Sequence, residues 1–217
     1  HGRLVLVGAL LMLAGSANAQ NLFANPDFEL GNTGFSSQYL YSGNGDLLTE
    51  GFYYVGTTPT TNNGNWTNIG DHTSGTGNMM LVNGSPVANR VVWSQTVTNL
   101  STNTDYYFSG WLASIFATNP ATLQFAVDGV PLGNTFNASS VVGQWDQWTT
   151  LWNSAGNTSA TFSIINQNTT LNGNDFALDD LVLSTTNPGG NNTSAPEPGT
   201  LALLGVPALA FFRKRRG

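Results

Sequence analysis

The chain contains no cysteine, and almost no positive charge outside its two ends. Without cysteine there are no disulfides, thiol nucleophiles or thiolate metal sites, so a secreted domain of this sequence must be held together by core burial. Between Gln20 and Ala195 the only cation is Arg90, against eleven carboxylates, which gives a net charge of −10. A surface of that sign repels phosphate backbones, which excludes nucleic acid as a partner and favours divalent cations.

The residues that a hydrolase would need are also scarce. His72 is the only histidine after residue 20, and no Gly-x-Ser-x-Gly turn presents a serine nucleophile. A glycosidase needs two facing carboxyl groups, one with a raised pKa, and no motif singles out such a pair. We therefore predict no catalytic residues, with a glycoside-active enzyme as the remote alternative.

The N-terminal region has the pattern of an export signal. Arg3 precedes an apolar stretch from Leu4 to Ala14, and the small residues that follow include Ala17-x-Ala19. This order is typical of a secretory signal peptide cleaved after the second small residue. We interpret residues 1–19 as a signal peptide whose start is missing, since the chain opens with His1, and predict cleavage after Ala19.

The C-terminal region combines three elements: Pro196-Glu197-Pro198, the apolar residues 199–212, and the basic cluster Arg213-Lys214-Arg215-Arg216. Fourteen helical residues reach only about 21 Å, short of the roughly 30 Å hydrocarbon core, which favours a transient anchor over a permanent span. The basic cluster fits the cytoplasmic side of the inner membrane.

This tail, residues 196–217, resembles the PEP-CTERM sorting signal of bacteria that make extracellular polysaccharide. The resemblance implies processing by an exosortase-type membrane enzyme. It predicts export, transient inner-membrane anchoring, and then delivery to the cell surface or extracellular matrix. The alternative is an ordinary tail anchor in which Pro-Glu-Pro is accidental.

Between these ends, short runs rich in valine, isoleucine, threonine and aromatic residues alternate with glycine, asparagine and proline. Such runs predict strands, and helical periodicity is hard to find. The ten predicted strands are 21–24, 38–41, 52–55, 78–82, 90–97, 105–114, 122–127, 145–152, 159–166 and 176–184. They predict one all-β sandwich domain over residues 20–184.

Turn and linker signals agree with this division. Asn83-Gly84, Asp128-Gly129 and Asn172-Gly173 are residue pairs that tolerate positive φ and predict turns between strands. Residues 185–195 lack any core-forming side chain, which predicts a flexible linker.

Four segments of the domain, taken together, resemble one family: residues 21–29, 71–80, 106–111 and 174–181. They are similar to the jelly-roll domains related to galactose-binding and family 4/9 carbohydrate-binding modules. The resemblance implies a sandwich of two antiparallel sheets with the first and last strands side by side, and often a structural calcium ion. The tryptophan common soon after the opening Asn-x-x-Phe-Glu is absent, and Phe35 is the nearest aromatic residue.

The same resemblance implies that Glu29, Asp71 and the pair Asp179-Asp180 come together, and we predict a structural calcium site there. Calcium takes six to eight oxygen ligands, which carboxylates supply. Neighbouring side chains of a strand point to opposite faces, so we expect only one of Asp179 and Asp180 to bind the ion, and the choice stays open. The alternative is that these carboxylates are solvated or cap turns.

Sugar recognition needs aromatic faces beside hydrogen-bonding groups. Tyr53, Tyr54 and Trp66 lie next to loop-forming residues and are the candidates for such a platform, with Arg90 as the single cationic donor. The alternative for each is a packing role. The other tryptophans that fall within predicted strands are expected in the core, namely Trp93, Trp111, Trp148 and Trp152.

The sequence therefore predicts an exported, non-enzymatic protein of the cell surface or matrix that associates with extracellular polysaccharide. The alternative is a lectin-like carbohydrate-binding module. An exposed aromatic platform would favour the lectin, a flat polar surface would favour a structural role, and a cleft with two carboxyl groups would favour catalysis.

Overall fold

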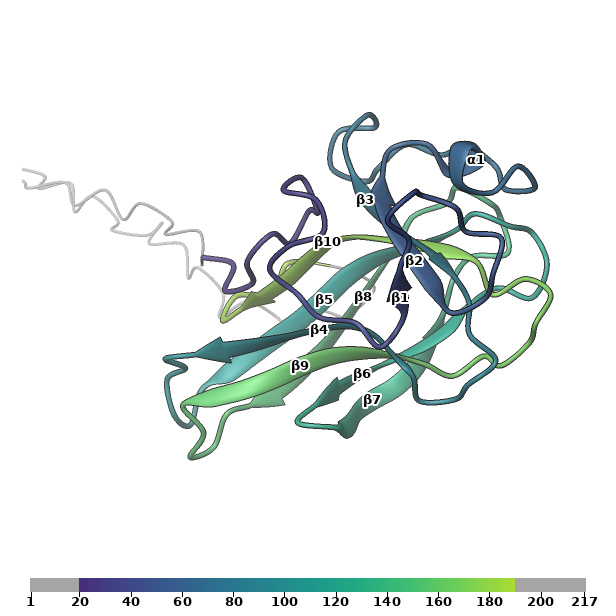
Figure 1. The fold of residues 1–217 in the computed structure, drawn as a ribbon. Coiled ribbons are helices and arrows are strands. Elements are labelled where there is room, and N and C mark those ends of the chain that lie inside the picture. Colours follow the sequence, from purple (N-terminus) through teal and green to yellow (C-terminus); the bar gives the residue numbers. More distant parts are fainter. Residues whose placement is uncertain (1–19, 190–217) are drawn as a thin grey trace, which may run out of the picture.

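Runs of β-branched and aromatic residues form ten strands in the computed structural model, which describes residues 20–189 (Figure 1). The strands are β1 (Leu40–Tyr41), β2 (Phe52–Gly56), β3 (Met79–Asn83), β4 (Val91–Thr98), β5 (Asp105–Ser114), β6 (Thr122–Val127), β7 (Val130–Asn137), β8 (Asp146–Asn153), β9 (Ser159–Asn166) and β10 (Phe176–Ser184). The helix α1 (Pro59–Asn62) is a single turn with proline at its start.

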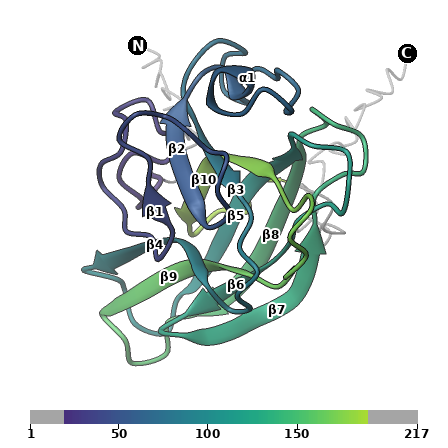
Figure 2. The same ribbon diagram turned by 45° about the vertical axis from the view of Figure 1, so that its right-hand side comes forward.

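The strands form two layers (Figure 2). One sheet has the order β1-β2-β3-β10-β5-β8, and the other has the order β4-β9-β6-β7. All pairs are antiparallel except β1 with β2, which is parallel. The predicted all-β sandwich is confirmed. No helix among the described residues is long and apolar enough to cross a bilayer.

Two strand predictions were wrong. Residues 21–24 are not a strand, yet they lie beside β10: Leu22 N–H donates to Leu183 O over 2.9 Å, and the side chain of Asn21 bonds Leu181 O and Leu183 N–H. The side chain of Asn21 thus replaces part of a regular ladder. Strand β7 was missed because Pro131 and Gly133 interrupt its sequence pattern.

The turn predictions held in two of three places. Asp128 and Gly129 have φ of +49° and +78° and join β6 to β7, and Gly173 has φ of +95°. Gly84 has no positive φ; a Cβ there would overlap the backbone oxygen of Asn174, so close packing explains this glycine.

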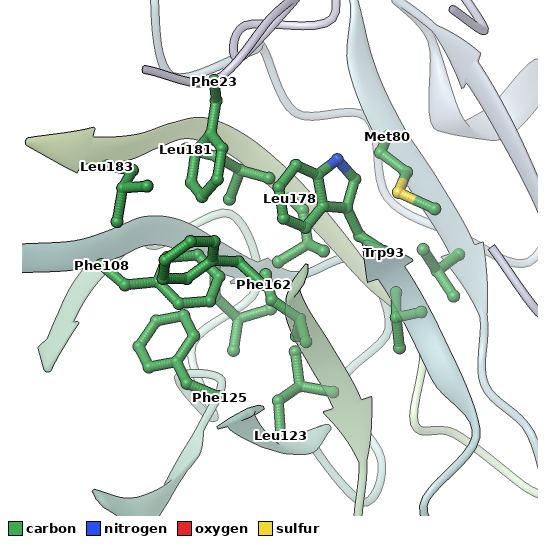
Figure 3. Packing of buried hydrophobic residues seen from close by; sticks show 14 of the residues in the cluster. Phe23, Met80, Trp93, Phe108, Leu123, Phe125, Phe162, Leu178, Leu181 and Leu183 are labelled. Carbon is green, nitrogen blue, oxygen red and sulfur yellow. The ribbon is translucent and has the colours of Figure 1, made fainter. Parts of the chain in front are cut away.

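The main core lies between the sheets and is rich in aromatic residues (Figure 3). Trp93, Phe108 and Phe162 are fully buried. Phe23 meets Trp93 edge to face with ring centroids 4.8 Å apart, and Phe108 lies 4.3 Å from Phe125. Each such side chain contributes about 1.5–3 kcal/mol by burial, so this cluster supplies the stability that disulfides would otherwise add.

A second, smaller core covers the outer face of the six-stranded sheet. Met79, Leu81 and Ala177 face outward from β3 and β10, and they are buried by Leu47 and Trp66. Trp66 belongs to residues 57–78, the connection between β2 and β3, called the outer loop from here on. Because the outer loop packs onto the sheet, β3 is buried on both faces.

Candidate functional site

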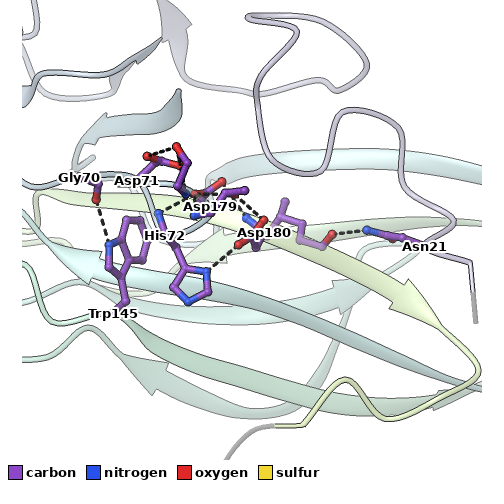
Figure 4. Close-up of polar contacts among 10 residues, drawn as sticks. Asn21, Gly70, Asp71, His72, Trp145, Asp179 and Asp180 are labelled. Atoms are coloured by element: carbon purple, nitrogen blue, oxygen red, sulfur yellow. Dashed lines mark hydrogen bonds and ion pairs between the residues drawn. The ribbon is translucent and has the colours of Figure 1, made fainter. Parts of the chain in front are cut away.

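Two adjacent carboxylates of β10 hold the outer loop (Figure 4). Asp179 is fully buried, and its Oδ2 accepts the backbone N–H groups of His72 and Thr73 over 2.8 and 3.2 Å. Asp180 has φ of +46° at a bulge that shifts the register between Asp179 and Val182. Its oxygens lie 2.6 Å from His72 Nδ1 and 2.8 Å from Thr73 Oγ1. Both carboxylates therefore reach one loop, which corrects the expectation drawn from regular strand alternation.

The other two predicted calcium ligands contact the same loop. Asp71 accepts the backbone N–H groups of Ser74 and Gly77 over 2.8 and 2.6 Å. Glu29 Oε1 accepts the N–H of Asn78 over 2.7 Å. A Cβ on Gly77 would overlap Glu29 Oε1 and lie 3.2 Å from Asp71 Oδ2, so the two carboxylates meet at a residue that must be glycine.

These carboxylates differ in charge state. Burial, together with repulsion from Asp180, raises the pKa of Asp179 to about 7. Burial also acts to raise the pKa of Asp71, but hydrogen bonds from Ser74 and Gly77 outweigh it, and the pKa is lowered. Asp71 thus holds the loop as an ion, whereas Asp179 is partly protonated at neutral pH.

The four residues gather on the loop without forming a calcium cage. Most of the oxygens of Asp71, Asp179 and Asp180 already accept hydrogen bonds. Within residues 20–189, no three of histidine, aspartate and glutamate are grouped as metal ligands. The contacts are those of carboxylates that cap a loop, and calcium stays a prediction.

The side chain of His72 is packed against aromatic rings. Its ring stacks on Trp111 with centroids 3.7 Å apart and planes at 17°, and Trp145 meets it edge to face. Trp145 Nε1 donates to Gly70 O over 3.1 Å, so the indole also holds the loop backbone beside His72. Together with the contact to Asp180, these neighbours fix the histidine in place.

The predicted sugar platform is not formed. Tyr53 is 6% exposed and its hydroxyl donates to Asn32 Oδ1, while Trp66 is 4% exposed beneath the outer loop. Tyr54 is half-buried and stacks on Tyr41, with ring centroids 5.8 Å apart. The outer loop and its second core thus remove the Trp66 face from solvent.

The fourth platform candidate, Arg90, is also occupied. Its Nε and Nη2 donate to Gln38 O over 3.1 and 2.9 Å, and its Nη1 donates to Ser85 Oγ. The guanidinium lies 5.1 Å from the centre of the Tyr39 ring. Arg90 therefore ties the segment before β1 to the start of β4.

A different cluster of polar groups lines a pocket of about 180 Å³ where β3 ends and β10 begins. We call it the end pocket. Exposed Leu48 and Leu171 supply apolar surface at its lining. The full lining is Leu48, Glu50, Asn63, Asn65, Trp66, Asn83, Phe116, Leu171, Asn172, Gly173 and Asp175.

Some of these polar groups build the end pocket, and others are available to a ligand. Asp175 accepts Trp66 Nε1–H over 3.0 Å and the N–H of Gly84 over 3.3 Å, so it fixes the outer loop to the sheet. The side chains of Glu50, Asn65 and Asn172 make no hydrogen bond within residues 20–189.

Sequence patterns did not single out the polar residues of the end pocket. The turn pairs Asn83-Gly84 and Asn172-Gly173 and the platform candidate Trp66 fall in this region, but no pattern pointed to Glu50 or Asn65. Burial raises the pKa of Asp175 to about 6, and the negative charge of Glu50 acts in the same direction, against the hydrogen bonds from Trp66 and Gly84.

Comparisons with known proteins establish the fold. No family model matches the chain, and no curated protein matches it. Among solved structures, the CBM22-1 xylan-binding domain of Paenibacillus barcinonensis Xyn10C is 14% identical, with a TM-score of 0.50 over 78% of this chain and 97% of that domain. An arabinose-bound GH51 α-L-arabinofuranosidase, MgGH51, is 12% identical, with a TM-score of 0.50 over 79% of this chain and 27% of the enzyme. The similarity of this chain to these two structures is a similarity of fold.

The Asp175 carboxyl predicts a pH-dependent stability. Its pKa is raised from 3.8 to about 6, so the folded protein holds this proton more tightly than the unfolded chain. The contribution of Asp175 to the free energy of unfolding should therefore fall as pH rises from about 4 to about 6 and level off above. Asp175→Asn should remove up to about 3 kcal/mol of this fall.

Urea unfolding at about pH 4 and about pH 7 measures this difference. Asp105→Asn, which removes an exposed carboxylate of β5, is the control for loss of one negative charge. An Asp175→Asn slope equal to that of the parent would show that Asp175 ionises normally.

Calcium binding predicts a shift in thermal stability. Glu29 accepts a single N–H from the loop, on Oε1, so it is the predicted ligand with the most remaining capacity. An ion at a hundred times its Kd stabilises by about 2.7 kcal/mol. We expect Ca²⁺ to raise the melting midpoint over EDTA in the parent and less in Glu29→Gln. Coincident parent curves would rule calcium out.

Proposed function

We propose that this chain is an exported, non-enzymatic protein that binds carbohydrate and associates with extracellular polysaccharide. The observation that supports this is the end pocket, where Glu50, Asn65 and Asn172 are free beside apolar surface. Sugar hydroxyls donate to carboxylates and accept from amides, while their C–H faces pack on apolar side chains. The fold, which a xylan-binding domain shares, is compatible with this role.

The charge of the end pocket narrows the ligand class. Glu50 and Asp175 both line it, and no Lys or Arg does. Uronate, sulfate or phosphate groups would be repelled by these carboxylates in a domain that carries one arginine. The proposed ligand is therefore a neutral glycan.

Two carboxyl groups in one pocket would also suit a glycosidase, but Asp175 is poorly placed for that role. It is 7% exposed, and its two oxygens accept hydrogen bonds from Trp66 and Gly84. An acid catalyst has to reach the glycosidic oxygen, which leaves Glu50 without a partner. We therefore favour binding without catalysis.

The sorting half of the proposal rests on sequence. Residues 1–19 and 196–217 lie outside the described residues. Their patterns support export, transient inner-membrane anchoring and an exosortase-type partner, as argued from Pro196-Glu197-Pro198 and the basic cluster.

If the end pocket binds sugar, removal of the Glu50 charge should lower the affinity for sugar. A hydrogen bond to a charged group contributes about 1.5–3 kcal/mol, so Glu50→Gln should weaken binding by about tenfold or more. Isothermal titration with neutral xylan and galactan oligosaccharides measures the change, and oligogalacturonate should not bind the parent.

Asp128→Asn is the matched control, because it removes one carboxylate charge at the β6–β7 hairpin, outside the end pocket. Equal affinity of the parent and Glu50→Gln would remove the end pocket from the proposal. Release of reducing sugar during the titration would instead favour catalysis.

Processing predicts a shortened C-terminus. Mass spectrometry of surface and inner-membrane fractions should find mature chains that lack Arg213 to Arg216, and cleavage after Ala19 should make Gln20 the first residue of these chains. Replacing Pro196 and Pro198 with alanine should leave an uncut chain in the inner membrane. A full-length chain in the cytosol of the parent strain would contradict this half of the proposal.

A further inference from the structure

A second cavity lies where the edges of the two sheets meet. Strand β7 is the edge of the four-stranded sheet, β8 is the edge of the six-stranded sheet, and the two are in contact. Between them is a cavity of about 300 Å³, called the seam cavity here. It shares no lining residue with the end pocket.

One part of the lining is aromatic. Phe136 and Trp148 stack with ring centroids 5.3 Å apart and planes at 24°, and Phe125 lies 4.7 Å from Phe136. Phe136 comes from β7 and Trp148 from β8, so the stacked pair spans the seam between the two sheets. Such rings offer apolar surface to the C–H groups of a ligand.

The polar part of the lining carries no charge. It consists of hydroxyls and an amide, among them Thr149, Thr150 and Asn134. Thr149 and Thr150 are half-buried on β8, whereas Asn134 is exposed on β7. A ligand that matches both parts must combine an apolar face with hydroxyl or ether oxygens and have no net charge.

One buried donor in this lining lacks an acceptor. Trp148 Nε1 is inaccessible to solvent and makes no hydrogen bond within residues 20–189. Buried indole N–H groups usually find a partner, because an unsatisfied one costs about as much as a lost hydrogen bond. Because this atom is closed to an oxygen-sized probe, a ligand in the seam cavity meets the Trp148 ring and not its N–H.

The chain is locally shaped to bring the two edges together. Gly133 has φ of +68°, and a Cβ there would lie 2.9 Å from Thr150 Oγ1. The β6–β7 register shifts between Leu123 and Phe125, directly opposite this glycine. The irregularity lets β7 approach β8 closely while the edges stay unpaired.

From these observations we propose that the seam cavity is a second saccharide site, which binds one ring of a neutral glycan against the Trp148 side chain. The sugar ring packs on the part of the aromatic lining that faces the cavity, chiefly Trp148, and the Thr150 hydroxyl binds its outer hydroxyls, since the Thr149 hydroxyl already donates to Gly189 O. The site extends the proposed carbohydrate binding, which rests on the end pocket, to a separate part of the domain.

The six tryptophans allow one experiment to test both sites. Indole N–H signals of the ¹⁵N-labelled chain are recorded while xylotriose or galactotriose is added. Trp148→Phe and Trp66→Phe assign the signals of the seam cavity and of the end pocket. We expect the Trp148 signal to shift as neutral trisaccharide is added and to reach a plateau at saturation. Trigalacturonate should leave the position of the signal unchanged.

The outcomes separate the two proposals. A shift of Trp66 alone would overturn the seam site and leave the proposed function standing, whereas a shift of Trp148 alone would support the seam site and remove the end pocket. No shift of Trp148 with either neutral trisaccharide would mean that no saccharide contacts its ring, and the proposal would fail.

A matched variant tests the aromatic contact itself. Trp148→Ala removes the ring that lines the cavity, so the affinity reported by the backbone amides of Thr149 and Thr150 should fall about fivefold. Trp152→Ala, on the same strand but outside the lining, is the control. Equal losses in the two variants would indicate a general packing effect and overturn the assigned contact.

Discussion

The outer loop is held in place by buried carboxylates that accept its N–H groups. The second core and the end pocket both depend on this contact. Asp179 holds the loop at His72 and Thr73, Asp71 closes it on itself, and Asp175 fixes it through Trp66. Burying a carboxylate is costly unless donors surround it, and here the donors belong to the loop being fixed. A chain without cysteine thereby secures a 22-residue connection between β2 and β3.

Fixing the outer loop has two effects on function. It buries Trp66, which turns a candidate sugar platform into the wall of a second core, and it places Asn63 and Asn65 beside residues 172–175 at the end of the sandwich. The end pocket is thus a product of the loop, whereas the seam cavity is a product of the sheet edges. The two cavities arise from separate parts of the fold, and for both we propose uncharged ligands rich in oxygen.

Sequence patterns predicted the sandwich well because each strand is marked by a local run of β-branched and aromatic residues. They failed where the chain departs from regularity: Pro131 and Gly133 hid β7, and the positive φ of Asp180 cancelled the alternation expected of β10. The four carboxylates Glu29, Asp71, Asp179 and Asp180 were placed together by family resemblance, and they do meet on one loop. The end pocket could not be predicted, since Glu50, Asn65 and Asn172 meet only through tertiary packing that no local pattern records.

Strand β10 has a further consequence, because its two ends serve different neighbours. It begins beside Asp175 in the end pocket and finishes at Ser184, next to the Asn21 segment that opens the described chain. Nine residues of strand span about 30 Å, so both routes out of the domain leave from the pole opposite the end pocket. A support attached to the chain beyond Ser184 would therefore lie on the far side of the domain from the end pocket, which would leave the mouth of that pocket unobstructed.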